Sequence, residues 1–407
     1  MRRDVNGKAG SLLNLPRNVW AVSITSFLMD ISSEMVLNLL PLFLSSVLGV
    51  QTTFIGLIEG LAEATSSLLR IVSGWLSDRL GSRKWLAVVG YAISAVAKPV
   101  FYVANSWLTA AAARLGDRVG KGVRTAPRDA LIADSVGQEK RGLAFGFHRA
   151  ADSAGALLGI LGALLAVWLT QGRASHLQAH TFRVIVLVSL VPAFLAVLAL
   201  AVGAREVALR RTGRPSIGFR GLGKSFGVFL LLAAVFELGN SADAFLVLRA
   251  QSLGTGVLAI LGMLAAFNLV YTLVSTPAGA LSDRIPRRAL IVGGWFVYAA
   301  IYIGIGLTPV GWSMWLFYLA YGAYYGAAYG TARAFVADLV PAELRGTAYG
   351  AYATVVGVMS LPASLLAGIF WDKFGPASAF FFGGGLALLA ALGLMAWKGP
   401  DTARATG

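Results

Sequence analysis

The stretch Gly74-Trp-Leu-Ser-Asp78-Arg79-Leu-Gly81-Ser-Arg83-Lys84 lies between two long apolar runs, and a second copy at residues 279–288 begins 205 positions later. Another motif, residues 133–146, recurs at residues 337–350, an offset of 204. Two motifs that recur at nearly the same offset, about half the chain length, indicate an internal duplication. Duplicated membrane halves are typical of secondary transporters, in which the substrate site lies between the halves near the bilayer midplane.

The composition favours a membrane protein. Of the 407 residues, 57% are hydrophobic and 13% are charged, whereas soluble domains carry about 25% charged residues. The net charge of +15 resides in short segments between apolar runs and not on a basic, aromatic-rich face. We therefore expect no nucleic-acid partner. The chain has no cysteine, which excludes disulfides and thiolate-bound metals, and we expect no cofactor.

Twelve apolar runs are each long enough for a helix to cross a hydrocarbon core, which takes about 20 residues. Membrane strands would be shorter and would alternate strictly between apolar and polar residues. The sequence therefore predicts an all-α polytopic membrane protein with two pseudo-symmetric six-helix halves, 1–203 and 225–407, joined by a linker at 204–224. The runs are 19–48, 53–77, 85–104, 107–133, 142–169, 181–203, 225–249, 256–281, 289–308, 312–338, 347–371 and 376–397.

Lys and Arg in the short loops predict the orientation of the helices. The N-terminal tail, the loop at 78–84 and the linker at 204–224 are rich in these residues and fall on one side if the helices alternate. The turns at 49–52 and 308–311, on the other side, carry none. We therefore expect a multi-pass protein of the cytoplasmic (inner) membrane with both termini and the linker in the cytoplasm.

The loop pattern Gly-x-x-x-Asp-Arg-x-Gly-x-Arg-Lys after the second run, repeated after the eighth, resembles the signature loop of the major facilitator superfamily. Arg118-Val-Gly-Lys121-Gly122 resembles the Arg-x-x-Gln-Gly element of this family, with Lys121 in place of Gln, and the resemblance associates it with proton transfer. Gly155-Ala-Leu-Leu-Gly159 is similar to the start of a glycine-rich element typical of antiporters. The resemblance covers the whole chain and implies a twelve-helix transporter.

Ionisable residues interrupt several runs near their centres, which is expensive in a membrane and indicates a functional site. Asp30 and Glu34 share one helix face because they are four residues apart. The pKa of a carboxylate responds to burial and to nearby cations, so movement of Arg118 relative to these acids would load or release a proton. We therefore expect Asp30, Glu34, Arg118 and Asp152 to couple transport to protons.

Further polar residues are expected around the cavity between the halves, because the resembled fold places its first, fourth, seventh and tenth helices there. Some of these charges must form structural ion pairs, since unpaired charges do not persist in a membrane. A structural and a functional role therefore both stay open for each residue. The expected cavity residues are Glu63, Arg114, His148, Arg149, Glu237, Asp243, Asn268, Tyr325 and Arg333.

The two repeated motifs are predicted to form a gate at the cytoplasmic ends of the helices. The Asp78 carboxylate ends the second helix, where it can meet the N-terminus of a neighbouring helix, and the cations beside it can pair with acids of the other half. The fixed spacing and its repetition favour a gate over a merely solvated loop. The expected gate residues are Gly74, Asp78, Arg79, Arg83, Asp134, Glu139, Arg141, Gly279, Asp283, Arg284, Asp338, Glu343 and Arg345.

Together these features favour a proton-coupled secondary transporter that exports a small organic solute and functions as a monomer. An importer of a nutrient or a metal-chelate ligand is the alternative; a metal-ion exporter fits less well, because the chain has three histidines and no cysteine. The sequence shows neither a nucleophile–base constellation nor the phosphate-binding motif of a pump, so we expect no enzyme activity. The substrate class stays open between a zwitterion or anion and a lipophilic cation.

Overall fold

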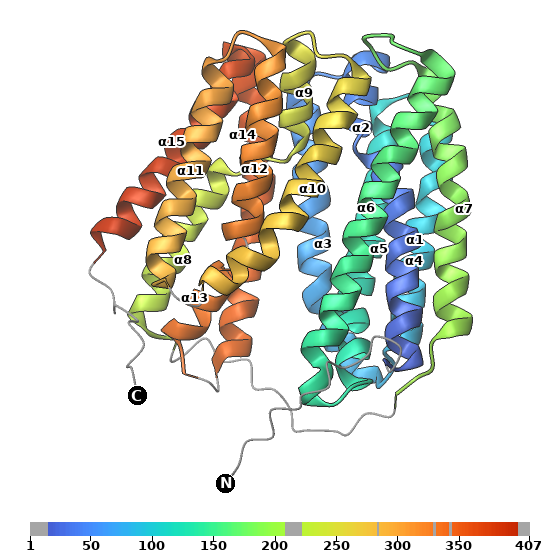
Figure 1. Ribbon diagram of the computed structural model, residues 1–407, viewed down its shortest axis with the longest axis vertical. Coiled ribbons are helices and arrows are strands. Elements are labelled where there is room, and N and C mark those ends of the chain that lie inside the picture. Colours follow the sequence, from blue (N-terminus) through green and yellow to red (C-terminus); the bar gives the residue numbers. More distant parts are fainter. Residues whose placement is uncertain (1–14, 208–221, 283–284, 329–330, 342–343, 398–407) are drawn as a thin grey trace.

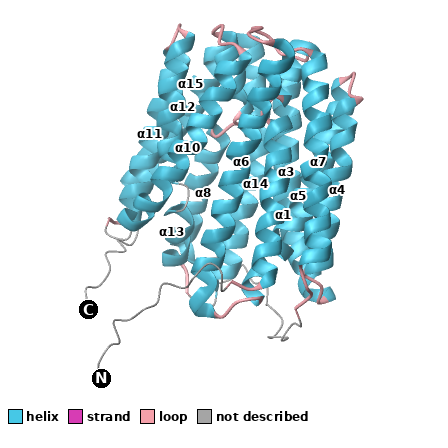
Figure 2. Ribbon diagram, turned by 45° about the vertical axis from the view of Figure 1, so that its right-hand side comes forward, coloured by secondary structure: helices cyan, strands magenta, loops and turns pink. Residues whose placement is uncertain are grey.

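The computed structural model describes residues 15–207, 222–282, 285–328, 331–341 and 344–397, and every regular element in these ranges is a helix (Figure 1, Figure 2). The helices form twelve crossings between the two ends of the molecule. The first crossing consists of α1 (Arg17–Leu37), α2 (Leu40–Leu42) and the π-helical η2 (Phe43–Val47). The others are α3 (Thr52–Leu80), α4 (Lys84–Tyr102), α5 (Trp107–Asp134), α6 (Arg141–Gln171), α7 (Ala179–Gly203), α8 (Gly223–Gly239) with α9 (Ala244–Ser252), α10 (Val257–Ser282), α11 (Arg287–Leu307), α12 (Met314–Ala328) with α13 (Thr331–Leu339), α14 (Arg345–Phe374) and α15 (Pro376–Ala396).

The helices suit a bilayer. Within the described ranges, nine helical segments are long and apolar enough to cross a membrane. The remaining crossings are α3 and α5, which carry the buried charges described below, and the crossing that contains α12 and α13 on either side of residues 329–330. Large apolar side chains cover the outer surface; Leu169, Leu231, Leu307 and Phe374 are each at least 65% exposed. Such a surface is stable against lipid tails.

Two crossings that we expected to be single helices are broken. In the first run, 19–48, α1 ends at Leu37, and Pro41, which has no backbone N–H, stands in the next short helix. The seventh run, 225–249, is divided at residues 240–243, where Asn240 has φ −92° and ψ 76°, outside the helical region. Non-helical backbone at membrane depth is tolerated only where protein buries it or water reaches it.

Corresponding helices pack in the same way in the two halves, as an internal duplication requires. In the N-terminal half α1 packs on α6 and α7, α3 packs on α5, and α4 packs on α7. In the C-terminal half α8 packs on α14 and α15, α10 packs on α12, and α11 packs on α15. Between the halves, α3 packs on α14 and α6 packs on α10. Together with smaller contacts of α9 with α2 and α3, they make up the interface between the halves.

The interface is closed at one end of the molecule. We call the end where α1 begins and α15 ends the termini side, and the opposite end the far side (Figure 1). On the far side, a Cβ on Gly56 would lie 2.1 Å from the carbonyl oxygen of Ser364, and a Cβ on Gly368 would lie 2.6 Å from the Cα of Thr53. The backbones of α3 and α14 therefore touch there, which only glycine permits. On the termini side, by contrast, no described atom lies within 4 Å of a Cβ built on Gly142, Gly146, Gly346 or Gly350.

Candidate functional site

Two ion pairs join α3 to α5 inside the N-terminal half. The Nη2 atom of Arg114 lies 2.5 Å from Oε2 of Glu59, and the two side chains are 6% and 8% exposed. One helical turn further along, Nη1 of Arg118 lies 3.5 Å from Oε2 of Glu63, whose side chain is 48% exposed. The Arg114–Glu59 pair is therefore buried in protein, whereas the Arg118–Glu63 pair borders solvent-accessible space.

The glycine element that we expected at Gly155 and Gly159 lies where α6 packs closely against α1. A Cβ on Gly155 would lie 2.5 Å from the carbonyl oxygen of Phe27, and a Cβ on Gly159 would lie 2.6 Å from that of Ile31. The two glycines therefore let the helix backbones touch. Because Asp152 precedes Gly155 by three residues, this contact holds the Asp152 carboxylate beside the middle of α1.

Asp30 and Glu34 lie on the part of α1 that α6 covers. Glu34 accepts a hydrogen bond from Nδ2 of Asn38 at 2.8 Å. Within the described residues, Asp30 has no hydrogen bond and no ion pair. The charged groups that act on Asp30 electrostatically are Asp152, Glu34, Arg124 and Lys121. Asp30 is thus a mid-membrane carboxylate surrounded by charges of both signs but tied to none of them.

Arg118 forms no ion pair with Asp30 or Glu34 among the described residues, although the Glu34 carboxylate acts on it electrostatically. It pairs with Glu63, because Arg114 and Arg118 share the face of α5 that packs on α3. Arg124 lies six residues after Arg118, about a third of a turn around the helix. Its Nη1 atom donates to Oγ of Ser94 at 2.5 Å, and its guanidinium lies 4.6 Å from the ring centre of Tyr91. The cations of α5 that act on Asp30 are therefore Arg124 and Lys121.

Sequence reasoning missed Lys98, a lysine of α4 that is completely buried. Its Nζ atom donates to Oγ of Ser32 at 2.5 Å and to Oγ of Ser33 at 3.1 Å, and lies 3.5 Å from Sδ of Met29. No carboxylate of the described residues lies within ion-pair distance of it. The signal was present, since a lysine inside the apolar run 85–104 is as costly as the acids that we singled out.

His148 and Arg149 occupy opposite environments on α6. His148 is 4% exposed, and its Nε2 atom lies 3.5 Å from Oδ2 of Asp152. Arg149 is exposed and donates a hydrogen bond to the hydroxyl of Tyr271 on α10. The Arg149 contact crosses from one half to the other, so it belongs to the interface along which α6 and α10 meet.

The expected polar residues of the C-terminal half surround the break between α8 and α9. Glu237 accepts a hydrogen bond from Nδ2 of Asn240 at 3.1 Å, and Asp243 accepts one from the hydroxyl of Tyr321 at 2.9 Å. Tyr325 packs against Tyr321 with ring centres 5.8 Å apart. The structure therefore gathers two carboxylates and several tyrosines at one level of the half.

Of the two other expected cavity residues in this half, the side chain of Asn268 is described and that of Arg333 is not. Asn268 donates to the carbonyl oxygen of Leu264 within its own helix, at 3.1 Å. Arg333 lies outside the described side chains, as do the expected gate residues Asp283, Arg284 and Glu343. Gly279 lies in α10, but its surroundings are likewise outside the description.

The gate residues that are described pair within their own halves. Arg83 contacts Asp78 at 2.5 Å and Asp134 at 3.2 Å, while Arg79 lies over the ring of Trp75. In the second half, Arg287 contacts Asp338 at 2.6 Å. Arg345 donates to the carbonyl oxygen of Ala337, Gly74 faces Ala126, and Glu139 and Arg141 are exposed. The repeated motifs therefore occupy matching places, but in this conformation the described residues form no ion pair across the halves.

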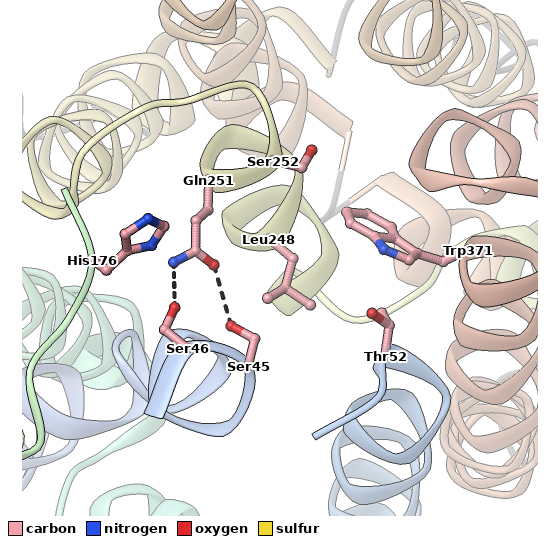
Figure 3. A pocket seen from close by; sticks show the side chains of 8 residues that line it. All are labelled: Ser45, Ser46, Thr52, His176, Leu248, Gln251, Ser252 and Trp371. Atoms are coloured by element: carbon pink, nitrogen blue, oxygen red, sulfur yellow. Dashed lines mark hydrogen bonds between the residues drawn. The ribbon is translucent and has the colours of Figure 1, made fainter. Parts of the chain in front are cut away.

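Polar contacts hold the halves together on the far side instead. Gln251 of α9 contacts the hydroxyls of Ser45 and Ser46 in η2, at 3.2 and 2.6 Å (Figure 3). Asp372 near the end of α14 accepts hydrogen bonds from the backbone N–H groups of Thr52 and Thr53. An open pocket of about 520 Å³ lies between these contacts, lined by Ser45, Ser46, Thr52, His176, Leu248, Gln251, Ser252 and Trp371 (Figure 3).

Comparison with known proteins extends these observations. The uncharacterized MFS-type transporter MJ1317 of Methanocaldococcus jannaschii is 35% identical over 394 residues, which cover 94% of this chain and 95% of that protein. The multidrug resistance protein MdtH of Cronobacter sakazakii is 32% identical over 130 residues, 30% of each chain. A solved D-xylose-proton symporter has a TM-score of 0.77 at 15% identity, covering 95% of this chain and 98% of that one, and this likeness concerns the fold.

The family model described as Major Facilitator Superfamily matches residues 22–364 and 225–406. The resemblance of the signature loops to this family is thereby confirmed over nearly the whole chain. The name of MJ1317 as an MFS-type transporter agrees with the paired halves and with the charged groups inside the bundle. This chain is a multi-pass membrane transporter, not an enzyme, and it belongs to the Major Facilitator Superfamily.

Proposed function

We propose that the protein is a proton-coupled exporter of small organic solutes that works by alternating access. The halves 1–203 and 225–407 move against each other, with 204–224 as the tether between them. The transporter functions as a monomer in the cytoplasmic membrane, with the termini side in the cytoplasm. In this orientation the far side is external, and the present conformation faces inward.

The observation that carries the proposal is the contrast between Asp30 and the acids of α3. Glu59 and Glu63 are each held by an arginine of α5, at 2.5 and 3.5 Å. Asp30, which also lies within a membrane crossing, has no hydrogen bond or ion pair among the described residues and lies beside Asp152 and near Lys121. A carboxylate in the membrane that is not tied to a cation is the group best suited to take up and release a proton.

The positions of Asp30 and Asp152 suggest how protons and conformation are coupled. Protonation of Asp30 removes its attraction to the cations of α5 and its repulsion of the Asp152 carboxylate. Because Asp30 and Asp152 lie on α1 and α6, and the cations lie on α5, this change acts directly on helices that pack around the central space. Protonation would thereby bias one of the two arrangements of the halves.

Two observations support export. The 130-residue similarity to MdtH, a multidrug resistance protein, favours outward transport of organic compounds. The close contact of α6 with α1 at Gly155 and Gly159 also matches the place at which the sequence resembles the glycine-rich element of antiporters. An antiporter uses inward proton flow to drive solutes outward.

The test is gradient-driven transport by the purified protein in liposomes that contain a pH-sensitive dye. A panel of organic compounds is screened for those that release protons from, or draw protons into, the vesicles. With an active compound, Asp30→Asn should abolish gradient-driven accumulation while leaving compound exchange without a gradient. The charge-removing substitution Lys373→Gln, at the exposed end of α14, is the control. Gradient-driven transport by Asp30→Asn at the parent rate would refute the role of Asp30, and a parent that moves solutes without protons would refute coupling.

The orientation is tested separately, with reporter fusions after residues 213 and 175. The proposal expects a cytoplasmic location for the first reporter and an external location for the second. The opposite pair of locations would reverse the membrane orientation and with it the direction that we assign to this conformation.

A further inference from the structure

The seventh crossing is interrupted where its two carboxylates lie. α8 ends at Gly239, α9 begins at Ala244, and the chain between them is not helical. In transporters, discontinuous helices of this kind form substrate and ion sites near the midplane. Asp243 is exposed even though the seven residues that follow it are all buried, so its side chain faces solvent-accessible space and not the core.

The carboxylates at this break are held only by neutral groups. Asn240 donates to Glu237, and Tyr321 donates to Asp243. Among the residues whose side chains are described, no lysine or arginine lies within 4 Å of either carboxylate. Arg249, on the same crossing, donates its hydrogen bonds to the carbonyl oxygens of residues 305, 306 and 308. The N-terminal half differs, since arginines hold Glu59 and Glu63 there.

Tyrosine rings form the wall beside these acids. Tyr321 and Tyr324 are stacked with ring centres 6.0 Å apart, and Tyr298 and Tyr302 are stacked at 4.1 Å. The Glu237 carboxylate acts electrostatically on Tyr324, so the wall extends from one carboxylate to the other. Tyrosine faces attract organic cations, and the attraction grows when the cation is desolvated.

An independent sign of a missing partner comes from Tyr318. Its side chain is 2% exposed, and its hydroxyl has no hydrogen-bond partner among the described residues. The hydroxyl lies close enough to Asp243 to interact with it electrostatically. A buried hydroxyl without a partner costs free energy unless something else supplies one. A ligand that donates hydrogen bonds next to Asp243 would do so.

We propose that this site binds a protonated organic amine. The ammonium group donates to Asp243, with the Tyr318 hydroxyl as a second acceptor, while the tyrosine faces receive the charge and the apolar body of the ligand. Glu237 at the other end of the tyrosine wall favours positive charge along the same surface. The proposal deepens the proposed function, because it assigns the exported solute to the class of organic amines and rests on that function.

The test uses three compounds that share a 2-(1-naphthyl)ethyl body and differ in the charge of the terminal group. They are 2-(1-naphthyl)ethylammonium, the neutral 2-(1-naphthyl)ethanol and the anion 3-(1-naphthyl)propanoate. Binding to the purified full-length protein in detergent is measured by titration calorimetry at neutral pH. The ammonium compound should bind at least tenfold more tightly than the other two. Equal or tighter binding of the alcohol or the propanoate, or no measurable binding of the ammonium compound, would overturn the proposal.

Variants locate the binding site. Asp243→Asn should weaken binding of the ammonium compound at least tenfold and leave binding of the alcohol unchanged. Tyr321→Phe, which keeps the ring and removes the donor to Asp243, should change the affinity for the ammonium compound less than Asp243→Asn does. Lys373→Gln should bind as the parent does. Parent-like affinity in a folded Asp243→Asn, checked by thermal unfolding and gel filtration, would place the amine elsewhere and refute the assignment.

The liposome dye assay separates this inference from the proposed function. Proton-coupled transport of other solutes without preference for the ammonium compound would refute the amine site alone. A preference for the ammonium compound without any proton movement would refute coupling alone.

Discussion

Replacing Asp372 by asparagine tests what holds the far side of the transporter shut. Asp372 lies near the end of α14 in the C-terminal half, whereas its partners begin α3 in the N-terminal half. Its Oδ1 accepts from the backbone N–H of Thr52 at 3.2 Å, and its Oδ2 accepts from the N–H and the hydroxyl of Thr53, both at 2.7 Å. A carboxylate from one half therefore caps the N-terminus of a helix in the other, where the helix dipole favours an anion.

The structure sets the size of the expected effect. A hydrogen bond to a charged group contributes about 1.5–3 kcal/mol. Asp372 is exposed, however, and exposed charges contribute only about 0–1 kcal/mol to stability. Asparagine also keeps one acceptor oxygen. We therefore expect Asp372→Asn to weaken the closed far side by about 1–2 kcal/mol, which is roughly a 5- to 30-fold shift in the ratio of conformations.

The assay uses the absence of cysteine from the chain, so that a single introduced cysteine reports alone. Leu248 lines the far-side pocket and is only 4% exposed in this conformation. The alkylation rate of Leu248→Cys by a membrane-impermeant maleimide follows the population that is open on the far side, provided that opening is fast. Asp372→Asn should raise this rate about 5- to 30-fold. Thr53→Ala, which removes one of the three hydrogen bonds, should raise it less.

Lys373→Gln is the matched control, because it changes the charge of the next residue without touching the cap. Its alkylation rate should stay within twofold of the parent's. If Asp372→Asn also stays within twofold, or if both substitutions raise the rate equally, the Asp372 cap does not hold the far side shut.

Two other substitutions follow from the packing. Glu59→Gln should lower the melting temperature, because it leaves the buried Arg114 charge with only the more distant Asp117 carboxylate, 4.0 Å from its Nη1. Loss of the whole partner of a buried charge costs about 3–5 kcal/mol, so the expected cost lies below that range. Replacing Arg114 by methionine in the same protein should recover part of the loss, and a parent-like melting temperature in the single variant would contradict the structural role. Gly350→Val should leave the melting temperature unchanged, because no described atom lies within 4 Å of a Cβ there, yet slow transport more than tenfold by blocking closure of the termini side. Gly385→Val, also in open space but on α15, is its control, and equal transport rates in the two variants would exclude blocked closure.

The crossings and the duplication could be predicted from the sequence because both appear as patterns along the chain. A run of about 20 apolar residues suits one membrane helix, and a duplicated motif keeps its offset. The break in the seventh crossing leaves no such pattern. Asn240 to Asp243 stand inside a run whose average remains apolar, and the loss of helical backbone there depends on tertiary contacts such as the hydrogen bond from the N–H of Ala242 to Ser364.

The ion pairs show the same limit at the level of side chains. Four-residue spacing puts Arg114 and Arg118 on one face of α5, and Glu59 and Glu63 on one face of α3, so the sequence indicates which groups act together. Which acid meets which cation depends on how each helix is rotated about its axis. That rotation is fixed by packing between α3 and α5, and for this reason Arg118 meets Glu63 and not Asp30.

The repeated glycines mark a surface that this conformation leaves open. Gly346 and Gly350 have the spacing that places two small residues on one helix face, and the first half repeats it at Gly142 and Gly146. The same helix α14 already touches α3 on the far side, through residues such as Gly368. The α14 helix therefore has glycines that permit close helix packing toward both of its ends, but among the described residues only those on the far side contact another helix here. If α14 tilts, the glycines on the termini side can form the same kind of contact. Closure of the termini side then exchanges one glycine-mediated helix contact for another, which keeps the two conformations close in free energy, as alternating access requires.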